Sequence, residues 1–340
     1  MIQIGEEKMK NVVVFGGGTG LSHILKGLKL FPVNVTAIIS VSDNGSSTGI
    51  LKKELNIPAI GDIGTVMISM ANTNDDVKNL LKYRFKNGSL ENHAVKNFLL
   101  AAMYDIKGNL TDAIEVLCNL LDIKGTILPI SDDVIEIVGH YDDGKKIVGE
   151  EQITQNGQPI KELTYNKKIK VNKKVYKAID EADLIIFSPG SLYTSVLPHL
   201  IIPEVADRIN NSKAKTMYVC NLFTQPGETD SFGVSDHLKV LEKYVKVDAV
   251  IANNAKLPKK ELKSYMTKEQ KDQVTLDTKQ IKKMRVELIA DRIYTLEDDI
   301  IRHDSLKTAY LIFSYLMRSD NKWHLPPKSK KKSLKKKQIV

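Results

Sequence analysis

The sequence predicts an α/β protein, with a Rossmann-like, doubly wound and mostly parallel sheet that carries a small antiparallel β insertion. Short runs rich in Val and Ile alternate with helical segments along the chain. This alternation is typical of a parallel sheet covered by helices on both faces. A glycine-rich turn follows the first run, and 42% of the residues are hydrophobic, enough for a buried core without disulfides or a metal.

The first half of the chain contains two expected strands and three expected helices. The glycine-rich turn ends the first Val-rich run, and a polar stretch ends the second. The last helix places an apolar residue on the same face at every third or fourth position. The predicted elements are strands over 10–15 and 34–41 and helices over 21–28, 92–104 and 110–121.

Residues 123–174 have a different character. Short alternating runs flank Asp143-Gly144 and Asn156-Gly157, dipeptides that are typical of β-hairpin turns. We therefore expect a small antiparallel insertion at one side of the core. After it the α/β pattern resumes, with strands over 183–188, 217–222, 247–253 and 285–290 and a closing helix over 305–317.

No internal repeat is visible, so the sequence predicts one domain. Its expected bounds are residues 10–318, with an N-terminal extension over 1–9 and a disordered Lys-rich tail over 326–340. The net charge of +9 comes mostly from seven lysines between 328 and 340, without which 43 basic residues face 41 acidic ones. A nearly neutral body is unlike a nucleic-acid-binding domain, so a nucleic-acid partner using the tail is the least favoured function.

The composition also limits the cellular compartments in which we expect the protein. No apolar run approaches the roughly 20 residues of a membrane span, and the first residues lack the apolar run of a signal peptide. The two cysteines lie far apart in apolar stretches, which is typical of buried thiols in a reducing compartment. The sequence therefore predicts a cytoplasmic protein without a membrane span, and it leaves a homo-oligomer open.

The first of four polar loops joins the first strand to the first helix. Glycines allow the backbone to approach a ligand closely, and free N–H groups at a helix N-terminus favour an anion. The spacing matches neither the dinucleotide fingerprint nor a P-loop. We expect phosphate binding here, with a simple tight turn as the alternative. The candidate residues are Gly16, Gly17, Gly18, Thr19 and Gly20.

The second loop, at 42–49, follows the second strand and contributes Asp43, Asn44 and Ser46 as candidate ligand contacts. An acidic residue at this place commonly meets a ribose. Asp43 is alternatively a ligand of Mg²⁺ through a phosphate-bound water shell, or part of a helix-capping Asx turn. Mg²⁺ with a bound nucleotide is thus the cofactor that the sequence leaves open.

Two further polar loops, at 187–195 and 221–229, also follow predicted strands. Ligands of open α/β sheets bind outside the carboxyl ends of the strands, so we expect all four loops to converge there. The candidates in the third loop are Gly190, Ser191 and Thr194, and those in the fourth are Asn221, Thr224 and Gln225.

Six motifs occur in the order seen in CofD-like proteins, and over roughly residues 11–317 the chain resembles the gluconeogenesis-factor branch of that family. They are Gly-Gly-Gly-Thr-Gly-Leu at 16–21, Asp-Asn-Gly-Ser-Ser-Thr-Gly at 43–49, Gly-Asp-Ile at 61–63, Ser-Pro-Gly-Ser-Leu-Tyr-Thr-Ser at 188–195, Thr-Gln-Pro-Gly-Glu-Thr-Asp at 224–230 and Arg-His-Asp at 302–304.

The resemblance implies a Rossmann-like core, a cytoplasmic location and a role in carbon metabolism and cell shape. It also implies that the chain binds UDP-sugars, with UDP-N-acetylglucosamine as the expected ligand. Carried over by motif position, Tyr265 and Arg302 are the expected sugar-nucleotide contacts. Asp62, His93 and Asn97 lie in further motifs and are added to the candidate ligand contacts.

The chain departs from the family pattern at two motifs. Gly64-Thr65 stands where the family usually has Arg-Asn, so a cation and an amide are missing there. Asn92 and Lys96 stand where the second motif usually has glycines.

Two classes of function remain. The favoured one is a non-catalytic, ligand-sensing regulator, because no catalytic triad or paired carboxylates can be nominated from spacing. The seven histidines also lack metal-ligand spacing, so no metal site is predicted. The alternative is a phosphoryl-type transferase like the 2-phospho-L-lactate transferase branch. Such an enzyme would use Mg²⁺ and a deazaflavin acceptor, with Asp43 and Asp62 in metal binding or proton transfer.

Overall fold

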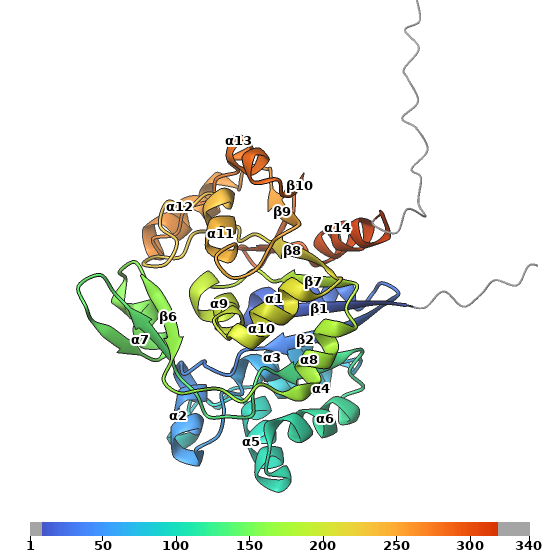
Figure 1. Cartoon of the computed structure of the whole chain (residues 1–340). Coiled ribbons are helices and arrows are strands. Elements are labelled where there is room, and N and C mark those ends of the chain that lie inside the picture. Colours follow the sequence, from blue (N-terminus) through green and yellow to red (C-terminus); the bar gives the residue numbers. More distant parts are fainter. Residues whose placement is uncertain (1–8, 319–340) are drawn as a thin grey trace, which may run out of the picture.

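The computed structural model describes residues 9–318, so the predicted Lys-rich tail and residues 1–8 of the extension lie outside the described residues. Seven parallel strands form one sheet in the order β10-β9-β8-β7-β1-β2-β3. The predicted α/β fold class is therefore confirmed (Figure 1). The strands are β1 (Lys10–Gly16), β2 (Val33–Ile39), β3 (Thr126–Pro129), β7 (Leu184–Phe187), β8 (Lys215–Val219), β9 (Ala249–Asn253) and β10 (Glu287–Asp291).

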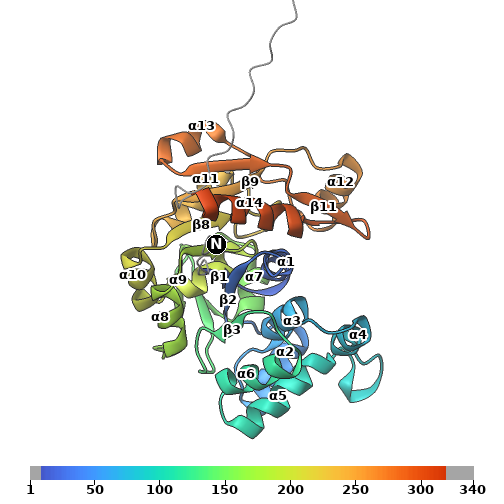
Figure 2. The same ribbon diagram turned by 90° about the vertical axis from the view of Figure 1, so that its right-hand side faces the viewer.

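Helices cover both faces of this sheet (Figure 2). One face carries α1 (Gly18–Leu28), which packs against α3 (Gly61–Met70) and α14 (Ser305–Arg318). The other face carries α8 (Lys173–Asp180), α9 (Leu197–Leu200) and α10 (Pro203–Asn211).

Apart from α7 (Glu150–Asn156) of the insertion, the other α-helices lie at the two ends of the sheet (Figures 1 and 2). At the β3 end lie α2 (Ser46–Leu55), α4 (Asp75–Lys82), α5 (Val95–Lys107) and α6 (Leu110–Leu120). At the β10 end lie α11 (Val234–Leu241), α12 (Lys259–Lys268) and α13 (Thr278–Ile281). None of the helices within residues 9–318 combines the length and apolarity needed to span a bilayer.

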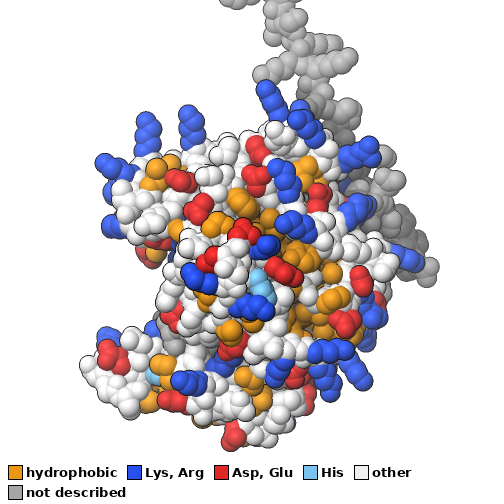
Figure 3. Space-filling model, turned by 60° about the vertical axis from the view of Figure 1, so that its left-hand side comes forward, with side chains coloured by type: hydrophobic (Ala, Val, Ile, Leu, Met, Phe, Trp, Pro, Cys, Tyr) orange, Lys and Arg blue, Asp and Glu red, His pale blue; other side chains and the backbone are white. Residues whose placement is uncertain are grey.

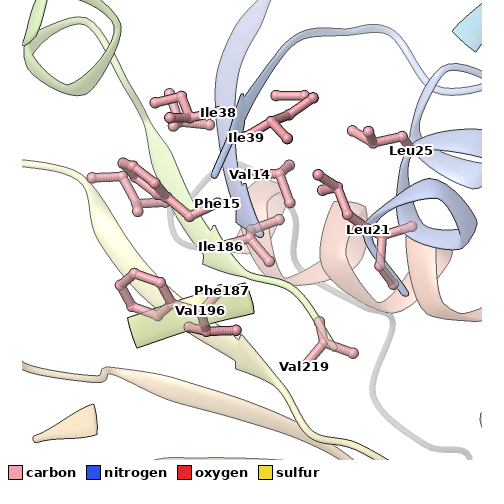
Figure 4. Packing of buried hydrophobic residues seen from close by; sticks show 14 of the residues in the cluster. Val14, Phe15, Leu21, Leu25, Ile38, Ile39, Ile186, Phe187, Val196 and Val219 are labelled. Atoms are coloured by element: carbon pink, nitrogen blue, oxygen red, sulfur yellow. The ribbon is translucent and has the colours of Figure 1, made fainter. Parts of the chain in front are cut away.

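The core forms because successive residues of the central strands point to opposite faces of the sheet. Figure 4 shows Val14 of β1 on the side of Leu21 and Leu25 of α1, with Phe15 and Phe187 on the opposite side. Phe15 and Phe187 are register partners across β1 and β7, and both are fully buried. Strands buried on both faces explain the nearly continuous apolar runs in the sequence.

The antiparallel insertion is a three-stranded sheet, β5-β4-β6, made of β4 (Ile137–His140), β5 (Lys146–Val148) and β6 (Glu162–Tyr165). It is smaller than the predicted stretch of 123–174, because Thr126–Pro129 joins β2 as the parallel edge strand of the large sheet. This four-residue strand follows Gly125, which has a φ of 116°, and is too short to show a period of its own.

One predicted hairpin turn is correct and the other is wrong. Asp143-Gly144 lies between the antiparallel strands β4 and β5, as expected. Asn156-Gly157 instead ends a helix, α7 (Glu150–Asn156), and Gly157 is its C-cap with a φ of 63°. Glycine in the left-handed conformation serves helix ends as well as hairpin turns, so the dipeptide alone did not distinguish them.

A second small sheet, β11 (Tyr294–Glu297) paired with β12 (Ile300–His303), was missed from the sequence. Its turn uses Asp298 and Asp299, both with positive φ, where glycine or asparagine is the usual signal. Over the face drawn in Figure 3, basic and acidic side chains are interspersed, in keeping with a nearly neutral body.

Candidate functional site

The order of the strands reverses at β1, whose neighbours are β2 on one side and β7 on the other. In doubly wound sheets the ligand crevice lies at this reversal, outside the carboxyl ends of the strands. A pocket of about 400 Å³ opens there, a size suited to a small molecule. We call it the loop pocket. Nine predicted residues line it, namely Thr19, Gly20, Gly190, Ser191, Asn221, Thr224, Gln225, Tyr265 and Arg302.

The glycines of the first loop allow it to pack directly on the third loop. A Cβ atom on Gly20 would lie 2.1 Å from the carbonyl oxygen of Pro189, and one on Gly16 would clash with the hydroxyl of Ser188. Gly18 has a φ of 61°, a conformation that favours glycine. The tight-turn alternative thus accounts for much of the glycine pattern, while Thr19 and Gly20 still face the loop pocket.

Partly buried hydrogen bonds hold the third and fourth loops together. The Gly190 N–H donates to Oδ1 of Asn221 at 2.9 Å, and Nδ2 of Asn221 donates back to the Gly190 carbonyl at 2.7 Å. The hydroxyl of Ser191 donates to the Glu228 carboxylate and accepts from the Thr194 N–H. Burial raises the pKa of Glu228 to about 7. Asn221 and Ser191 therefore position the pocket wall as well as lining it.

An aromatic pair and a cation form the outer part of the loop pocket. The rings of Phe223 and Tyr265 are stacked, with centroids 4.3 Å apart and planes 24° apart. Tyr265 comes from α12 and Arg302 from β12, so two elements remote in sequence bring them to the loops. The neighbouring His303 donates its Nε2–H to the Cys220 carbonyl at 3.1 Å, and burial lowers its pKa to about 4.

The predicted acidic residues lie in a second cluster beside the first loop, outside the lining of the loop pocket. We call Asp43, Asp62 and Glu150 the acid cluster. Asp62 lies against Gly17, where a Cβ atom would be 2.4 Å from its Oδ2. Burial first and then Asp43 raise the pKa of Asp62, whereas Lys96 lowers it. Burial and Asp43 likewise raise the pKa of Glu150. At neutral pH, protons therefore stay on part of this cluster.

Lys96 of α5 supplies a cation to the acid cluster. Its Nζ donates to the Gly61 carbonyl at 2.8 Å and to the hydroxyl of Thr65. Burial lowers the pKa of Lys96 to about 8, and Asp62 counters part of that effect. The position of Gly64 has no side chain, which leaves room for the lysine stem. Lys96 thus supplies, from position 96, the cation that the motif resemblance led us to expect at position 64.

Some predicted contacts serve the protein itself. Asn44 accepts from the Glu151 N–H at 2.9 Å and donates to Gln152, so it anchors the start of α7. Oδ1 of Asp43 accepts from the Gly45 N–H at 2.9 Å, which is the Asx turn considered above.

Thr194 lines the acid cluster rather than the loop pocket, because its hydroxyl donates to Glu150 at 3.0 Å. Asn97 donates to Ser47 of the second loop, while His93 is buried against Phe98. The side chain of Ser46 lies outside the described part of the structure.

Sequence reasoning missed four residues of the site: Glu150, Glu228, Phe223 and His23. Glu150 comes from the insertion, and nothing in its local sequence marks it as a partner of Asp43. Glu228 and Phe223 lie in the fourth loop, where an acid and an aromatic residue among polar neighbours were available signals. His23 lines the loop pocket beside Thr19, whereas a lone histidine within a predicted helix is typically a helix-surface or packing residue.

The residues fit Mg²⁺ only in its phosphate-bound mode. Among residues 9–318, no three His, Cys, Asp or Glu side chains are arranged to hold a metal ion by themselves. Mg²⁺ commonly takes one or two carboxylates and completes its shell with water and substrate phosphates. Asp43 and Asp62 fit that mode beside the first loop.

Comparisons with known proteins agree with this architecture. The family model described as 2-phospho-L-lactate transferase CofD matches residues 12–294. The chain belongs to the CofD family. Proteins named gluconeogenesis factor are 39% identical in Halalkalibacterium halodurans and 38% identical in Bacillus subtilis, each over 90% of this chain, covering 96% and 98% of those proteins.

A crystal structure of a Bacillus halodurans protein superposes on this CofD-family chain with a TM-score of 0.87 at 38% identity. The match covers 90% of this chain and 100% of that one. The resemblance read from the six motifs is therefore confirmed at the level of the family and of relatives named gluconeogenesis factor.

Proposed function

We propose that this chain is a cytoplasmic regulator that binds a nucleotide sugar of the UDP-N-acetylglucosamine type and links carbon metabolism to cell-wall synthesis and cell shape. The observation that carries the proposal is the loop pocket at the β1–β7 reversal, which combines an aromatic pair, an arginine and backbone amides. These are the groups that a base, a diphosphate and a sugar need.

For the base and the phosphates of the proposed ligand, the loop pocket offers matching groups in its lining. The Phe223–Tyr265 pair suits a uracil ring, since base stacking on aromatic side chains is favourable. Arg302 suits a phosphate, because guanidinium groups bind phosphate oxygens through paired N–H donors. Thr19 and Gly20 open α1, and an anion there meets free N–H groups and the positive end of the helix dipole.

A thermal-shift and calorimetric screen of UDP-sugars, UDP, GDP and GTP tests the proposal. A ligand at about 100 times its Kd stabilises the folded state by about 2.7 kcal/mol. We expect UDP-N-acetylglucosamine or a related UDP-sugar to raise the melting temperature and the guanine nucleotides to leave it unchanged. No shift with any uridine nucleotide would remove the proposal.

The acid cluster favours one second function, a phosphoryl-type transferase. Partly protonated carboxyls beside a phosphate-binding loop suit a site that binds Mg²⁺ with the substrate or that moves a proton. Mg²⁺ would supply charge neutralisation at the transferring phosphoryl group, and Asp43 and Asp62 would hold it. Turnover of a nucleotide-activated donor that disappears in Asp43→Asn would establish this function, and tight binding without turnover would exclude it.

A further inference from the structure

A second cavity of about 590 Å³ lies between α1, α3 and α4, next to the loop pocket. Thr19 and His23 line both cavities. The two cavities therefore adjoin along the first turns of α1, so a ligand whose diphosphate lies at the start of that helix has the second cavity beside it.

The second cavity is basic. Four lysines line it, from the end of α1 and from α4, against two acids, and we call this surface the lysine groove. Its charged residues are Lys26, Lys29, Lys78, Lys82, Asp75 and Glu297. Mutual repulsion between the cations is visible at Lys29, since burial and then Lys78, Lys124 and Lys26 lower its pKa. The groove thus presents a positive field beside the site.

Two of the four lysines already have structural partners. Lys29 donates to the carbonyls of Ser69 and Ala71, at 2.8 and 3.2 Å, and so closes the end of α3. Lys78 lies 3.8 Å from Asp75, one turn earlier on α4. These two lysines are therefore occupied in holding the walls of the groove.

The other two lysines, Lys26 and Lys82, are exposed, and neither has an ion-pair partner within the part of the chain that the structure describes. They approach the cavity from two different helices. Ser22 and Ser69 also line it, but their hydroxyls donate to the carbonyls of Gly18 and Val66. Two exposed ammonium groups beside one cavity match a carboxylate or a phosphate, because an ammonium group supplies both positive charge and hydrogen-bond donors to anionic oxygens.

We propose that the lysine groove binds an acidic group on the sugar end of the nucleotide ligand, so that the preferred ligands are nucleotide sugars whose sugar carries a carboxylate or a phosphate. This inference rests on the proposed function and narrows it, from the neutral N-acetylglucosamine nucleotide to related UDP-sugars that carry an acidic group. The nucleotide occupies the loop pocket, the diphosphate lies at Thr19 and Gly20, and the sugar lies along α1 toward Lys26 and Lys82.

UDP-glucose and UDP-glucuronic acid differ only by a carboxylate on the sugar and are the probes. Each is titrated calorimetrically at low salt into the parent chain and into Lys26→Met/Lys82→Met. Because a hydrogen bond to a charged group contributes about 1.5–3 kcal/mol, we expect the parent to bind the acidic sugar roughly tenfold or more tightly. That advantage should disappear in the double variant, while binding of UDP-glucose changes by less than about threefold.

The matched control is Lys107→Met/Lys213→Met, which removes the same charge from exposed lysines outside both cavities. It should keep the preference for the acidic sugar, and circular dichroism checks that each variant is folded. Equal affinity of the parent for the two sugars, or a preference that survives Lys26→Met/Lys82→Met, overturns the inference while the proposed function stands. If neither sugar binds the parent, the proposed function and the inference both fail.

Inorganic phosphate, titrated alone, separates a linked subsite from an independent anion site. The inference predicts weak phosphate binding that blocks only the added affinity of UDP-glucuronic acid. Saturation of the groove by phosphate that leaves both UDP-sugars unaffected would show an independent anion site and would overturn the inference.

Discussion

Gly64 and Lys96 face each other where α3 passes α5, and a Cβ atom on Gly64 would lie 2.9 Å from Cδ of Lys96. The absence of a side chain at position 64 and the presence of a lysine at position 96 therefore belong together. From the resemblance to CofD-like motifs we expect arginine at the first position and glycine at the second. In this chain the cation enters the site from α5 instead of from α3, and it still contacts Thr65 and the Gly61 carbonyl.

This relationship predicts a rescue between two positions. Gly64→Arg should lower the free energy of unfolding by about 1–3 kcal/mol, because the new side chain and Lys96 compete for one space. Adding Lys96→Gly should recover most of that loss. Urea denaturation of the two single variants and the double variant measures the coupling. Losses that simply add would show that the two residues do not share the space.

The titration of the acid cluster predicts a pH dependence of stability. The pKa of Asp62 is raised to about 7 in the folded chain from an ordinary value of 3.8. Between these values the folded chain holds more protons than the unfolded chain, so this group favours folding at low pH and the benefit is lost as the pH rises toward 7. The stability of the parent relative to Asp62→Asn should therefore fall between pH 4 and pH 7.

Urea denaturation across that pH range measures the difference, which changes by at most about 1.4 kcal/mol per pH unit for one proton. In the same experiment on Glu150→Gln, the stability of the parent relative to the variant should keep falling to a higher pH, because the pKa of Glu150 is raised to about 9. Asp105→Asn, an exposed acid on α5, is the control and should show neither trend. A parent-minus-variant difference that stays flat with pH for Asp62 would contradict the raised pKa.

The stacking of Tyr265 on Phe223 predicts that two substitutions of Tyr265 differ in their effect on nucleotide binding. Tyr265→Ala should weaken binding of the uridine nucleotide by about 1–3 kcal/mol, the usual contribution of a base stacked on an aromatic ring. Tyr265→Phe retains the ring over Phe223 and should bind within a few fold of the parent. Calorimetry with UDP and with UDP-N-acetylglucosamine measures both. Equal losses in the two variants would mean that the phenol hydroxyl, and not the ring, contacts the ligand.

The sequence predicted the framework of the site because that framework is local. Each central strand is a short apolar run, and each polar loop follows such a run directly, so Gly20 and Ser191 could be placed at the same edge. The edge strand at Thr126–Pro129 could not be recognised, since four residues are too few to show a period and its partner β2 lies some 90 residues away.

The chemical detail of the site depended on contacts between distant residues, which local patterns do not encode. Glu150 meets Asp43 only because the insertion folds back over the second loop, where Asn44 anchors the start of α7. Lys96 was visible only as a departure from a motif, and its compensation of Gly64 required the packing of α3 against α5. Ser191 and Asn221 were predicted as ligand contacts, but their hydrogen bonds to other residues of the protein were not predicted.

The last prediction concerns the first loop, where two glycines provide a matched pair. Gly18 and Gly108 both have positive φ, 61° and 75°, but only Gly18 lies in the loop that is proposed to meet the diphosphate, whereas Gly108 ends α5 and has open space around it. Valine at either position should destabilise the chain, because a β-branched residue in the left-handed conformation costs at least about 1–2 kcal/mol.

Only Gly18→Val should also weaken binding of the UDP-sugar, by tenfold or more if one charged contact of about 1.5–3 kcal/mol is lost. Its side chain would stand between the start of α1 and Asp62, whose Oδ1 lies 3.4 Å from the new Cβ position, and would keep a phosphate from the backbone. Calorimetry measures the affinity of each variant, and circular dichroism confirms that the sheet is intact. Because Gly108→Val shares the backbone strain, equal binding losses would be assigned to destabilisation. If folded Gly18→Val binds as tightly as the parent, the first loop does not hold the diphosphate.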